Sequence, residues 1–223
     1  MKNSLLSSIV LFVAGALAAS SVLAQEGKGN VKAGEKKAAM CIGCHGIVGY
    51  QASFPEIHKV PMIAGQNAEY IVAALVAYSK GERKHPTMRS IAGSLSEQDM
   101  ADLGAFYQQQ AKDAPAVAAK PVRPPSAKVA ELLNRTACIS CHGDNFSKPI
   151  SPAYPKLAGQ HADYLYVALK AYQIKNNAQL GRNNGVMAGI VSQYKNNEDL
   201  KLMADYIASL PGDMRVVPQP SFR

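Results

Sequence analysis

The chain has 223 residues, of which 48% are hydrophobic, 18% are charged and four are cysteines. This length suits one large domain or two small ones. The 24 basic and 16 acidic residues give a net charge of +8, which favours acidic partners or anionic membrane surfaces. Nucleic acid is not an expected partner, because no basic run reaches five residues and aromatic residues do not alternate with lysines.

Residues 1–24 have the pattern of a secretory signal peptide. Lys2 supplies a positive start, residues 5–18 are apolar apart from two serines, and Val-Leu-Ala at 22–24 is a small-residue cleavage site. We expect cleavage before Gln25 and a periplasmic mature protein, with attachment to the inner membrane left open. The alternative is an uncleaved anchor, which the shortness of the apolar run disfavours.

The first element of the mature chain is an expected helix from about residue 31 to residue 41, which leads into Cys-Ile-Gly-Cys-His at 41–45. The same C-x-x-C-H pattern returns at 138–142. It is the attachment pattern of a c-type haem, because two thiols on one helix face bond to the porphyrin edge beside a histidine that reaches the iron. The pattern predicts covalent attachment at Cys41, Cys44, Cys138 and Cys141, with His45 and His142 as axial ligands.

Two other uses of these cysteines were weighed. A secreted chain with four cysteines ordinarily forms disulfides, but a C-x-x-C disulfide closes a very short loop and constrains little of the unfolded chain. Zinc also binds pairs of cysteines with a histidine, but each site here needs a fourth ligand. Two covalent haem c groups, and thus two irons, explain the sequence better.

After the first motif the chain alternates between loops and helices. Residues 46–65 carry prolines and glycines, as an irregular loop does. A helical apolar face follows over residues 70–78, and Gly81 is expected to end that helix. A second loop runs through residues 85–88, and a capping box of Ser96 and Asp99 opens the next helix.

Residues 113–127 are rich in alanine and proline and are expected to form a semi-rigid linker. A proline-rich recognition motif is the alternative. The linker divides the mature chain into a first domain at 25–112 and a second domain at 128–223. No extended strand alternation appears, so the predicted fold is all-α, with two tandem helical domains around one covalent haem each.

The second domain repeats the first. Pro-Lys-Leu-Ala-Gly-Gln at 155–160 corresponds to Pro-Met-Ile-Ala-Gly-Gln at 61–66, and residues 164–172 repeat the apolar face of 70–78. Each unit of about 90 residues is small for an independent core. We therefore expect that the chain without haem folds poorly.

Met88 and Met187 are the predicted sixth ligands of the two irons, because these methionines occupy equivalent loop positions in the repeat. A thioether ligand favours ferrous iron and raises the reduction potential. Met100 and Met203 are expected to fill the core instead. His58, His85 and His161 are rival ligands, but we expect them to be surface or loop residues; His85 is the strongest rival because it is three residues from Met88.

Four further residues recur in both domains. Arg83 and Arg182 each precede the predicted methionine ligand by five residues, where a guanidinium suits a haem propionate; solvated loop arginines are the alternative. The carbonyls of Pro61 and Pro155 are candidates to accept a hydrogen bond from the axial imidazole and fix its orientation.

These motifs resemble those of the cytochrome c4 family over nearly the whole mature length. The resemblance rests on the two C-x-x-C-H motifs, the P-x-[IL]-A-G-Q segments, the tyrosine-bounded helices, Met88 and Met187. It implies two class I cytochrome c domains facing each other across a pseudo-twofold axis, with neighbouring propionate edges. It also implies His–Met ligation and electron transfer to a terminal oxidase or a similar acceptor.

The function that follows is that of a periplasmic dihaem protein that shuttles single electrons and is not an enzyme. Its expected partners are redox proteins of a respiratory chain, such as a terminal oxidase or a cytochrome bc1-type complex, and peripheral membrane association stays open. One alternative is an electron-transfer subunit of a dehydrogenase complex. Another is a haem enzyme of the peroxidase or thiosulfate-oxidising type, which needs an open sixth position at one iron.

Overall fold

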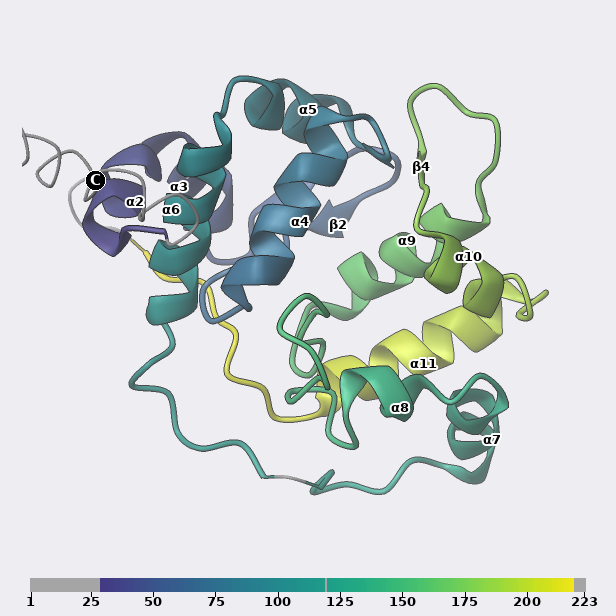
Figure 1. The fold of residues 1–223 in the computed structure, drawn as a ribbon. Helices are drawn as coiled ribbons and strands as arrows, with labels where there is room; N and C mark the ends of the chain where they lie inside the picture. Colours follow the sequence, from purple (N-terminus) through teal and green to yellow (C-terminus); the bar gives the residue numbers. More distant parts are fainter. Residues whose placement is uncertain (1–28, 119, 219–223) are drawn as a thin grey trace, which may run out of the picture.

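The computed structural model describes residues 29–118 and 120–218. These residues form the predicted all-α fold, in which two helical domains lie side by side and are joined by an extended segment (Figure 1). The predicted signal peptide at 1–24 lies outside the described residues. Within them, no helix is both long enough and apolar enough to cross a membrane.

The first domain contains α2 (Val31–Lys37), α3 (Ala39–His45), α4 (Ala68–Ser79), α5 (Pro86–Gly93) and α6 (Glu97–Gln109). The second domain contains α7 (Ala127–Arg135), α8 (Cys138–His142), α9 (Ala162–Gln173), α10 (Gly185–Val191) and α11 (Asn197–Ser209). Short strands accompany them: β1 (Gln51–Ala52), β2 (His58–Lys59) and β3 (Arg83–Lys84) in the first domain, and β4 (Gly181–Arg182) in the second.

The helix expected over residues 31–41 is divided into two. Asn30 caps α2 by accepting a hydrogen bond from the backbone N–H of Ala33 at 3.0 Å, and the fully buried Ala38 separates α2 from α3. In the second domain two residues, Thr136 and Ala137, separate α7 from α8, with Ala137 at a φ of 49°. Each haem-attachment motif therefore occupies a short helix of its own.

Gly34, inside α2, allows a close approach between two helices. A Cβ atom at this position would lie 2.1 Å from the backbone oxygen of Asp102 in α6. Only glycine allows α2 and α6 to pack at this separation. The cost of glycine inside a helix is therefore offset by packing against α6.

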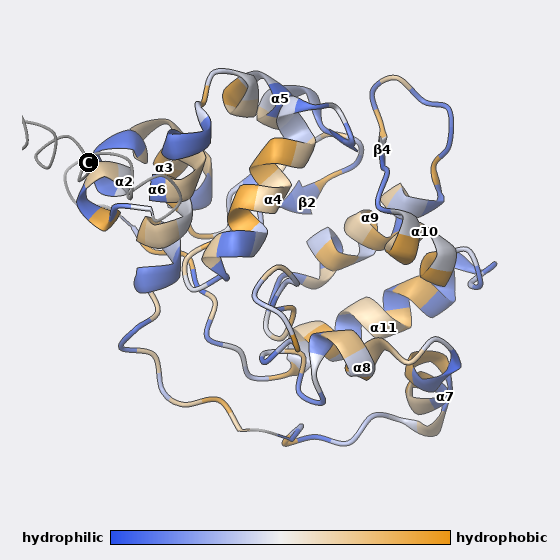
Figure 2. Ribbon diagram, in the orientation of Figure 1, coloured by the Kyte–Doolittle hydropathy of each residue, from blue (hydrophilic) through white to orange (hydrophobic). Residues whose placement is uncertain are grey.

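The long helices of each domain pack pairwise, α4 against α6 and α9 against α11. α11 carries both hydrophobic and hydrophilic residues along its length (Figure 2), as a helix that buries one face does. Its buried residues are Leu200, Met203, Ala204 and Ile207. The predicted capping box is confirmed at α6, where Ser96 and Asp99 exchange side-chain to backbone hydrogen bonds. Gly81, at a φ of 72°, follows the end of α4 as predicted.

The four strands are only two residues long, which explains why no alternation of apolar residues marks them. β1 and β2 pair antiparallel inside the first domain. β3 and β4 also pair antiparallel, with Arg83 opposite Arg182, and they join the two domains. The domains are thus connected by backbone pairing as well as by the covalent segment.

The placement of Met88 and Met187 in loops is wrong. Met88 is the third residue of α5 and Met187 the third residue of α10. Both helices are short and begin at a helix-favouring signal: Pro86 occupies the first turn of α5, and Asn184 caps α10. The glycines and proline of these segments therefore mark a helix start rather than a continuous loop.

Candidate functional site

The two C-x-x-C-H motifs present their side chains from α3 and α8. All four cysteines are half-buried, and no disulfide joins them. Burial raises the pKa of the Cys41 thiol. The thiols are thus neither paired in disulfides nor fully enclosed by protein, as attachment to a cofactor edge requires.

Each motif histidine is held by a proline carbonyl. The Nδ1–H of His45 donates to the carbonyl oxygen of Pro61 at 2.8 Å, and that of His142 donates to Pro155 at 3.2 Å. Burial lowers the pKa of both histidines, although these hydrogen bonds act in the opposite direction. With Nδ1 engaged as a donor, the Nε2 lone pair of each neutral ring is left available for a metal.

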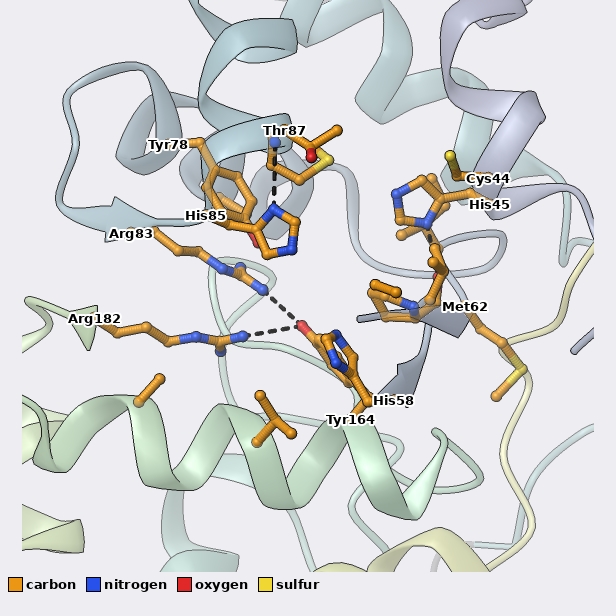
Figure 3. Close-up of a pocket in the computed structure, with 18 of the residues that line it drawn as sticks. Cys44, His45, His58, Met62, Tyr78, Arg83, His85, Thr87, Tyr164 and Arg182 are labelled. Carbon is orange, nitrogen blue, oxygen red and sulfur yellow. Dashed lines mark hydrogen bonds between the residues drawn. The ribbon is translucent and has the colours of Figure 1, made fainter. Parts of the chain in front are cut away.

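A cavity of about 610 Å³ extends from the first motif across the domain interface. Its lining includes Cys41, Cys44, His45 and Met88 from the first domain, and Tyr164 and Arg182 from the second. Figure 3 shows His45 and Cys44 on one side of this space and Arg83, Arg182 and Tyr164 on another. The volume lies within the range of about 300–1,000 Å³ that is usual for cofactor sites.

The apolar face predicted over residues 70–78 contributes to this cavity. Only Ile71 of that face is fully buried, whereas Tyr70, Ala74, Leu75 and Tyr78 are half-buried and line the space. An apolar face directed at a cavity rather than at another helix is what a large apolar cofactor would cover.

Met88 and Met187 have the same local geometry in the two domains. The backbone N–H of Met187 donates to the Asn184 side chain at 3.0 Å, and that of Met88 points to Nδ1 of His85 at 3.5 Å. Each methionine is therefore held at the third position of a capped helix. His85 serves as the cap of α5 at the position equivalent to Asn184.

The two recurring arginines meet at the domain interface. Arg83 donates to the hydroxyl oxygens of Tyr70 at 3.2 Å and Tyr164 at 2.6 Å, and Arg182 donates to Tyr164 at 3.3 Å. The arginines also lie over tyrosine rings, Arg83 over Tyr78 at 4.6 Å. They are half-buried, so the alternative of freely solvated loop arginines is wrong.

The arginine pair provides a test of whether the site fits haem. The buried Nε of Arg83 has no hydrogen-bond partner among the described residues, and two adjacent cations are costly to bury without an anion. Haem carries two propionate carboxylates on one edge, which suit a forked guanidinium. The site therefore fits haem: it offers thiols for attachment, a neutral imidazole for the iron, an apolar cavity for the porphyrin and two guanidinium cations that a carboxylate would neutralise.

Tyr164 lies between the two arginines, and its hydroxyl accepts a hydrogen bond from each of them. Burial raises the pKa of Tyr164, but Arg83 and Arg182 lower it by more, to about 8. The equivalent Tyr70 has one arginine partner, and burial raises its pKa. The interface field is therefore strongly positive on the side of Tyr164.

Of the histidines outside the two motifs, His58 is more buried than expected. His58 was expected at the surface or in a loop, but its side chain is only 5% exposed and its Nδ1 donates to the Glu56 carbonyl at 2.8 Å. It is buried because β2 pairs with β1 and lies against the cavity. His161 lies at the start of α9 and is half-buried.

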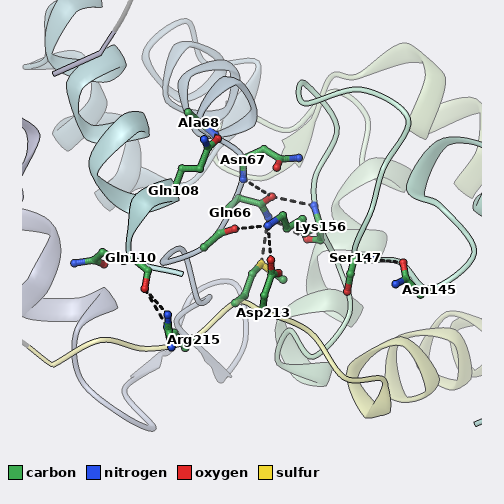
Figure 4. A network of polar contacts seen from close by, with 12 residues as sticks. Gln66, Asn67, Ala68, Gln108, Gln110, Asn145, Ser147, Lys156, Asp213 and Arg215 are labelled. Atoms are coloured by element: carbon green, nitrogen blue, oxygen red, sulfur yellow. Dashed lines mark hydrogen bonds and ion pairs between the residues drawn. The ribbon is translucent and has the colours of Figure 1, made fainter. Parts of the chain in front are cut away.

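Sequence reasoning did not identify the roles of Gln66 and Gln160. Both side chains are 4% exposed and cross from one domain to the backbone of the other. Figure 4 shows Gln66 with Lys156 and Asp213 at this contact. A polar residue that recurs at the end of both A-G-Q segments was the available signal, because a buried glutamine needs four partners.

Two tandem helical domains that each carry one C-x-x-C-H motif, with a haem-sized cavity at the first, define the class of dihaem c-type cytochromes. The sequence profile described as Cytochrome c matches residues 126–211. Cytochrome c4 of Thiocapsa roseopersicina is 32% identical over 192 residues, which cover 82% of this chain and 93% of that protein. The chain belongs to the cytochrome c4 family and carries two covalently bound haem c groups.

Two further comparisons bear on fold and role. The crystal structure of reduced cytochrome c4 from Pseudomonas stutzeri matches with a TM-score of 0.63 at 28% identity, covering 82% of this chain and all of that one. A protein of Stutzerimonas stutzeri described as a thiosulfate dehydrogenase electron acceptor is 29% identical, with coverage of 79% of this chain and 82% of that protein. The family relationship establishes a dihaem electron-transfer protein.

Proposed function

We propose that this protein is a periplasmic carrier of single electrons whose two irons have His–Met ligation. His45 and Met88 would bind one iron, and His142 and Met187 the other, with the thioether links at Cys41, Cys44, Cys138 and Cys141. The observation that carries the proposal is the twofold repetition of one arrangement, a histidine held by a proline carbonyl and a methionine held in a capped helix.

Different residues of the chain would have different roles in such a carrier. Bound haem supplies a one-electron iron couple. The proline carbonyls orient the axial imidazoles and increase their basicity, the methionine thioethers raise the potential, and the apolar cavity wall excludes water. Arg83 and Arg182 offer guanidinium donors to the propionates, at the point where the two domains meet.

A protein that only carries electrons does not need to bind or convert a substrate at its iron. A methionine at the sixth position leaves no site for peroxide or oxygen at the iron, so we infer that the protein is not an enzyme.

The boundaries that accompany this proposal are a leader at 1–24, domains at 25–112 and 128–223, and a linker at 113–127. We infer export to the periplasm from the leader, with a terminal oxidase or a cytochrome bc1-type complex among its partners.

Replacement of the ligand methionines tests the proposal. In Met88→Ala or Met187→Ala holoprotein, one iron should lose its far-red sulfur-to-iron absorption band, show a lower reduction potential and bind cyanide. The matched controls are Met100→Leu and Met203→Leu, which alter buried methionines that are each 3% exposed. If the ligand variants keep the spectrum of the wild type, the axial assignment is wrong.

A second candidate role concerns the donor. The similarity to thiosulfate dehydrogenase electron acceptors of Stutzerimonas stutzeri and Thiomonas intermedia favours delivery of electrons by a dehydrogenase of that kind. Stopped-flow mixing of the oxidised holoprotein with a thiosulfate dehydrogenase and thiosulfate tests this role. We expect the dehydrogenase to reduce this protein faster than it reduces an artificial electron acceptor. If this protein is not reduced, the role as acceptor for such a dehydrogenase is excluded.

A further inference from the structure

Gln66 and Gln160 form a reciprocal bridge between the domains. Gln66, in the first domain, accepts from the backbone N–H of Lys156 at 2.9 Å and donates to the carbonyl of the same residue at 3.0 Å. Gln160, in the second domain, accepts from the N–H of Met62 at 3.0 Å and donates to its carbonyl at 2.9 Å. Each primary amide therefore binds one residue of the opposite domain as a neighbouring strand would.

The hydrogen-bonding capacity of both amides is fully used. Gln66 Oε1 also accepts from the N–H of Asn67 at 3.0 Å, and its Nε2 also donates to the Met214 thioether at 3.3 Å. A glutamine amide offers two acceptor positions and two donor hydrogens. All four are satisfied, so the orientation of Gln66 is determined and its hydrogen bonds offset the cost of burying the amide.

Gln160 repeats this arrangement. Its Oε1 also accepts from the N–H of His161 at 3.0 Å, and its Nε2 also points to Met214 at 3.9 Å. Met214, 7% exposed, thus lies between the two glutamines. It is carried by the C-terminal segment, in which Arg215 pairs with Ala64 of the first domain.

The turn that presents each glutamine has a fixed requirement. Gly65 and Gly159 precede the two glutamines and have φ angles of 88° and 73°. Side chains other than glycine rarely adopt this conformation. At Gly65 a Cβ atom would also approach the backbone oxygen of Asp213 to 2.8 Å, so the turn and the C-terminal segment are packed together.

The residues that the glutamines hold have a specific place in the haem sites. Met62 directly follows Pro61, and Lys156 directly follows Pro155. The carbonyls of these two prolines accept the hydrogen bonds of His45 and His142. In each case the peptide unit that carries the proline carbonyl also carries the N–H bound by the glutamine of the other domain.

From this juxtaposition we propose that Gln66 and Gln160 are positioning residues that act across the interface. Gln66, in the first domain, sets the hydrogen bond of His142 in the second domain, and Gln160 sets that of His45. The orientation and basicity of each axial imidazole then depend on the opposite domain being docked. This inference rests on the proposed axial role of the two histidines.

Separation of the domains thus changes the electronic properties of both irons together. Loss of a glutamine frees the proline peptide unit, and its carbonyl becomes a weaker acceptor for the imidazole N–H. A less basic imidazole donates less to ferric iron, so the potential of that iron rises. The effect is crossed, because the substitution lies in one domain and the response in the other.

The experiment uses reduced, isotope-labelled holoprotein and follows the Nδ1 protons of the two axial histidines by NMR. In Gln66→Ala, solvent exchange of the His142 Nδ1 proton should be about tenfold faster, on the scale of one lost hydrogen bond. Exchange at His45 should stay at the wild-type rate. Gln160→Ala should give the opposite pattern, and in each variant the potential of the responding iron should rise.

Two companion variants separate positioning from folding. Gln66→Met keeps the volume of the side chain without its hydrogen bonds and should show the same faster exchange at His142. Gln108→Ala is the matched control, because Gln108 accepts from the N–H of Ala68 at the start of α4 and has no side-chain hydrogen bond to the second domain within the described part of the chain. It should leave both protons at wild-type rates.

The outcomes distinguish this inference from the proposed function. The inference is overturned if Gln66→Ala affects only His45, affects both histidines equally or affects neither, or if Gln66→Met restores wild-type exchange. The proposed ligation is tested in the same samples by the far-red band. If the wild type lacks that band at both irons, the proposed function fails; if the band is present but the crossed pattern is not, the inference alone fails.

Discussion

Arg83 of β3 and Arg182 of β4 lie directly opposite each other in the antiparallel pairing that joins the two domains. The residues around them are tyrosines, and both guanidinium groups donate to the hydroxyl of Tyr164. Two cations placed opposite each other are stable in a half-buried site when anions lie close by. Haem propionates at the interface would meet this requirement, and they would place the electron-exchanging edges of the cofactors near one another.

Loss of either guanidinium should lower the reduction potential of the haem beside it. Arg83→Gln and Arg182→Gln remove a positive charge that, next to the proposed propionates, would stabilise the ferrous state. The expected shift is about 60 mV for a one-electron couple, the equivalent of one charge-assisted hydrogen bond. Potentiometric titration measures it.

Lys201→Gln is the control for the arginine variants, since Lys201 is half exposed on α11 and pairs with Asp205. Its potentials should match those of the wild type. Equal shifts in Lys201→Gln and in the arginine variants would mean that the net charge of the protein, rather than contact with propionates, sets the potentials.

The C-terminal segment should contribute measurable stability through Lys156 and Asp213. Lys156 Nζ lies 2.6 Å from Asp213 Oδ2 and also donates to the carbonyl of Gly65 at 2.8 Å. The two side chains are 17% and 22% exposed, so water screens the pair only partly. A double-mutant cycle with Lys156→Met and Asp213→Asn should give a coupling free energy of about 1–2 kcal/mol in denaturant unfolding.

The exposed pair of Lys201 and Asp205 at 2.8 Å provides the comparison for that cycle. Its coupling free energy should be about 0.3–0.5 kcal/mol, as for other pairs four residues apart on a helix. A coupling at Lys156 and Asp213 no larger than this would show that the half-buried ion pair does not stabilise the C-terminal segment more than an exposed pair would.

The capping box of α6 predicts an acid-sensitive contribution to stability. Hydrogen bonds from Lys37 and from Ser96 lower the pKa of Asp99 to about 2. Because the pKa is lower in the folded than in the unfolded chain, where it is about 3.9, the contribution is complete above pH 4 and lost as the pH falls towards 2. Asp99→Asn should cost about 1 kcal/mol at pH 7.

Denaturant unfolding of wild type and Asp99→Asn between pH 7 and pH 2 measures this contribution. The difference in free energy of unfolding should decrease steadily below pH 4. Ser96→Ala should also cost about 1 kcal/mol at pH 7, because it removes the other half of the capping box. A difference between wild type and Asp99→Asn that is the same at every pH would contradict the ionic origin of the effect.

Removal of one haem should unfold one domain. In a variant with Cys138→Ser and Cys141→Ser, haem content should fall from about two to about one per chain, because the covalent attachment at the second motif is lost. The second domain should then unfold, because the haem completes a small core. Circular dichroism should then show a loss of helix content, and limited proteolysis should cut the second domain first. Undiminished helicity in this variant would show that the second core is stable without haem.

Local sequence patterns were sufficient to predict much of the fold. The apolar periodicity of α4, the capping box at Ser96 and the stop at Gly81 all rest on residues within a few positions of one another. The internal repeat then gave the two-domain arrangement, because equivalent residues such as Met88 and Met187 recur at nearly constant spacing.

Features that depend on long-range contacts were not predicted. The burial of His58 follows from pairing with β1, and the tolerance of Gly34 follows from contact with α6. The bridge from Gln66 to Lys156 joins residues of different domains. A single sequence contains no record of such partners, so it does not reveal the contacts of these residues.

The absorption spectrum of the purified holoprotein, oxidised and reduced, together with haem quantified against protein, tests the central claim most directly. The proposed function predicts two covalent haems per chain, with the far-red sulfur-to-iron band present at the intensity of two His–Met sites. A single haem, or one iron that lacks this band and readily binds carbon monoxide or cyanide, would contradict it and indicate a haem enzyme.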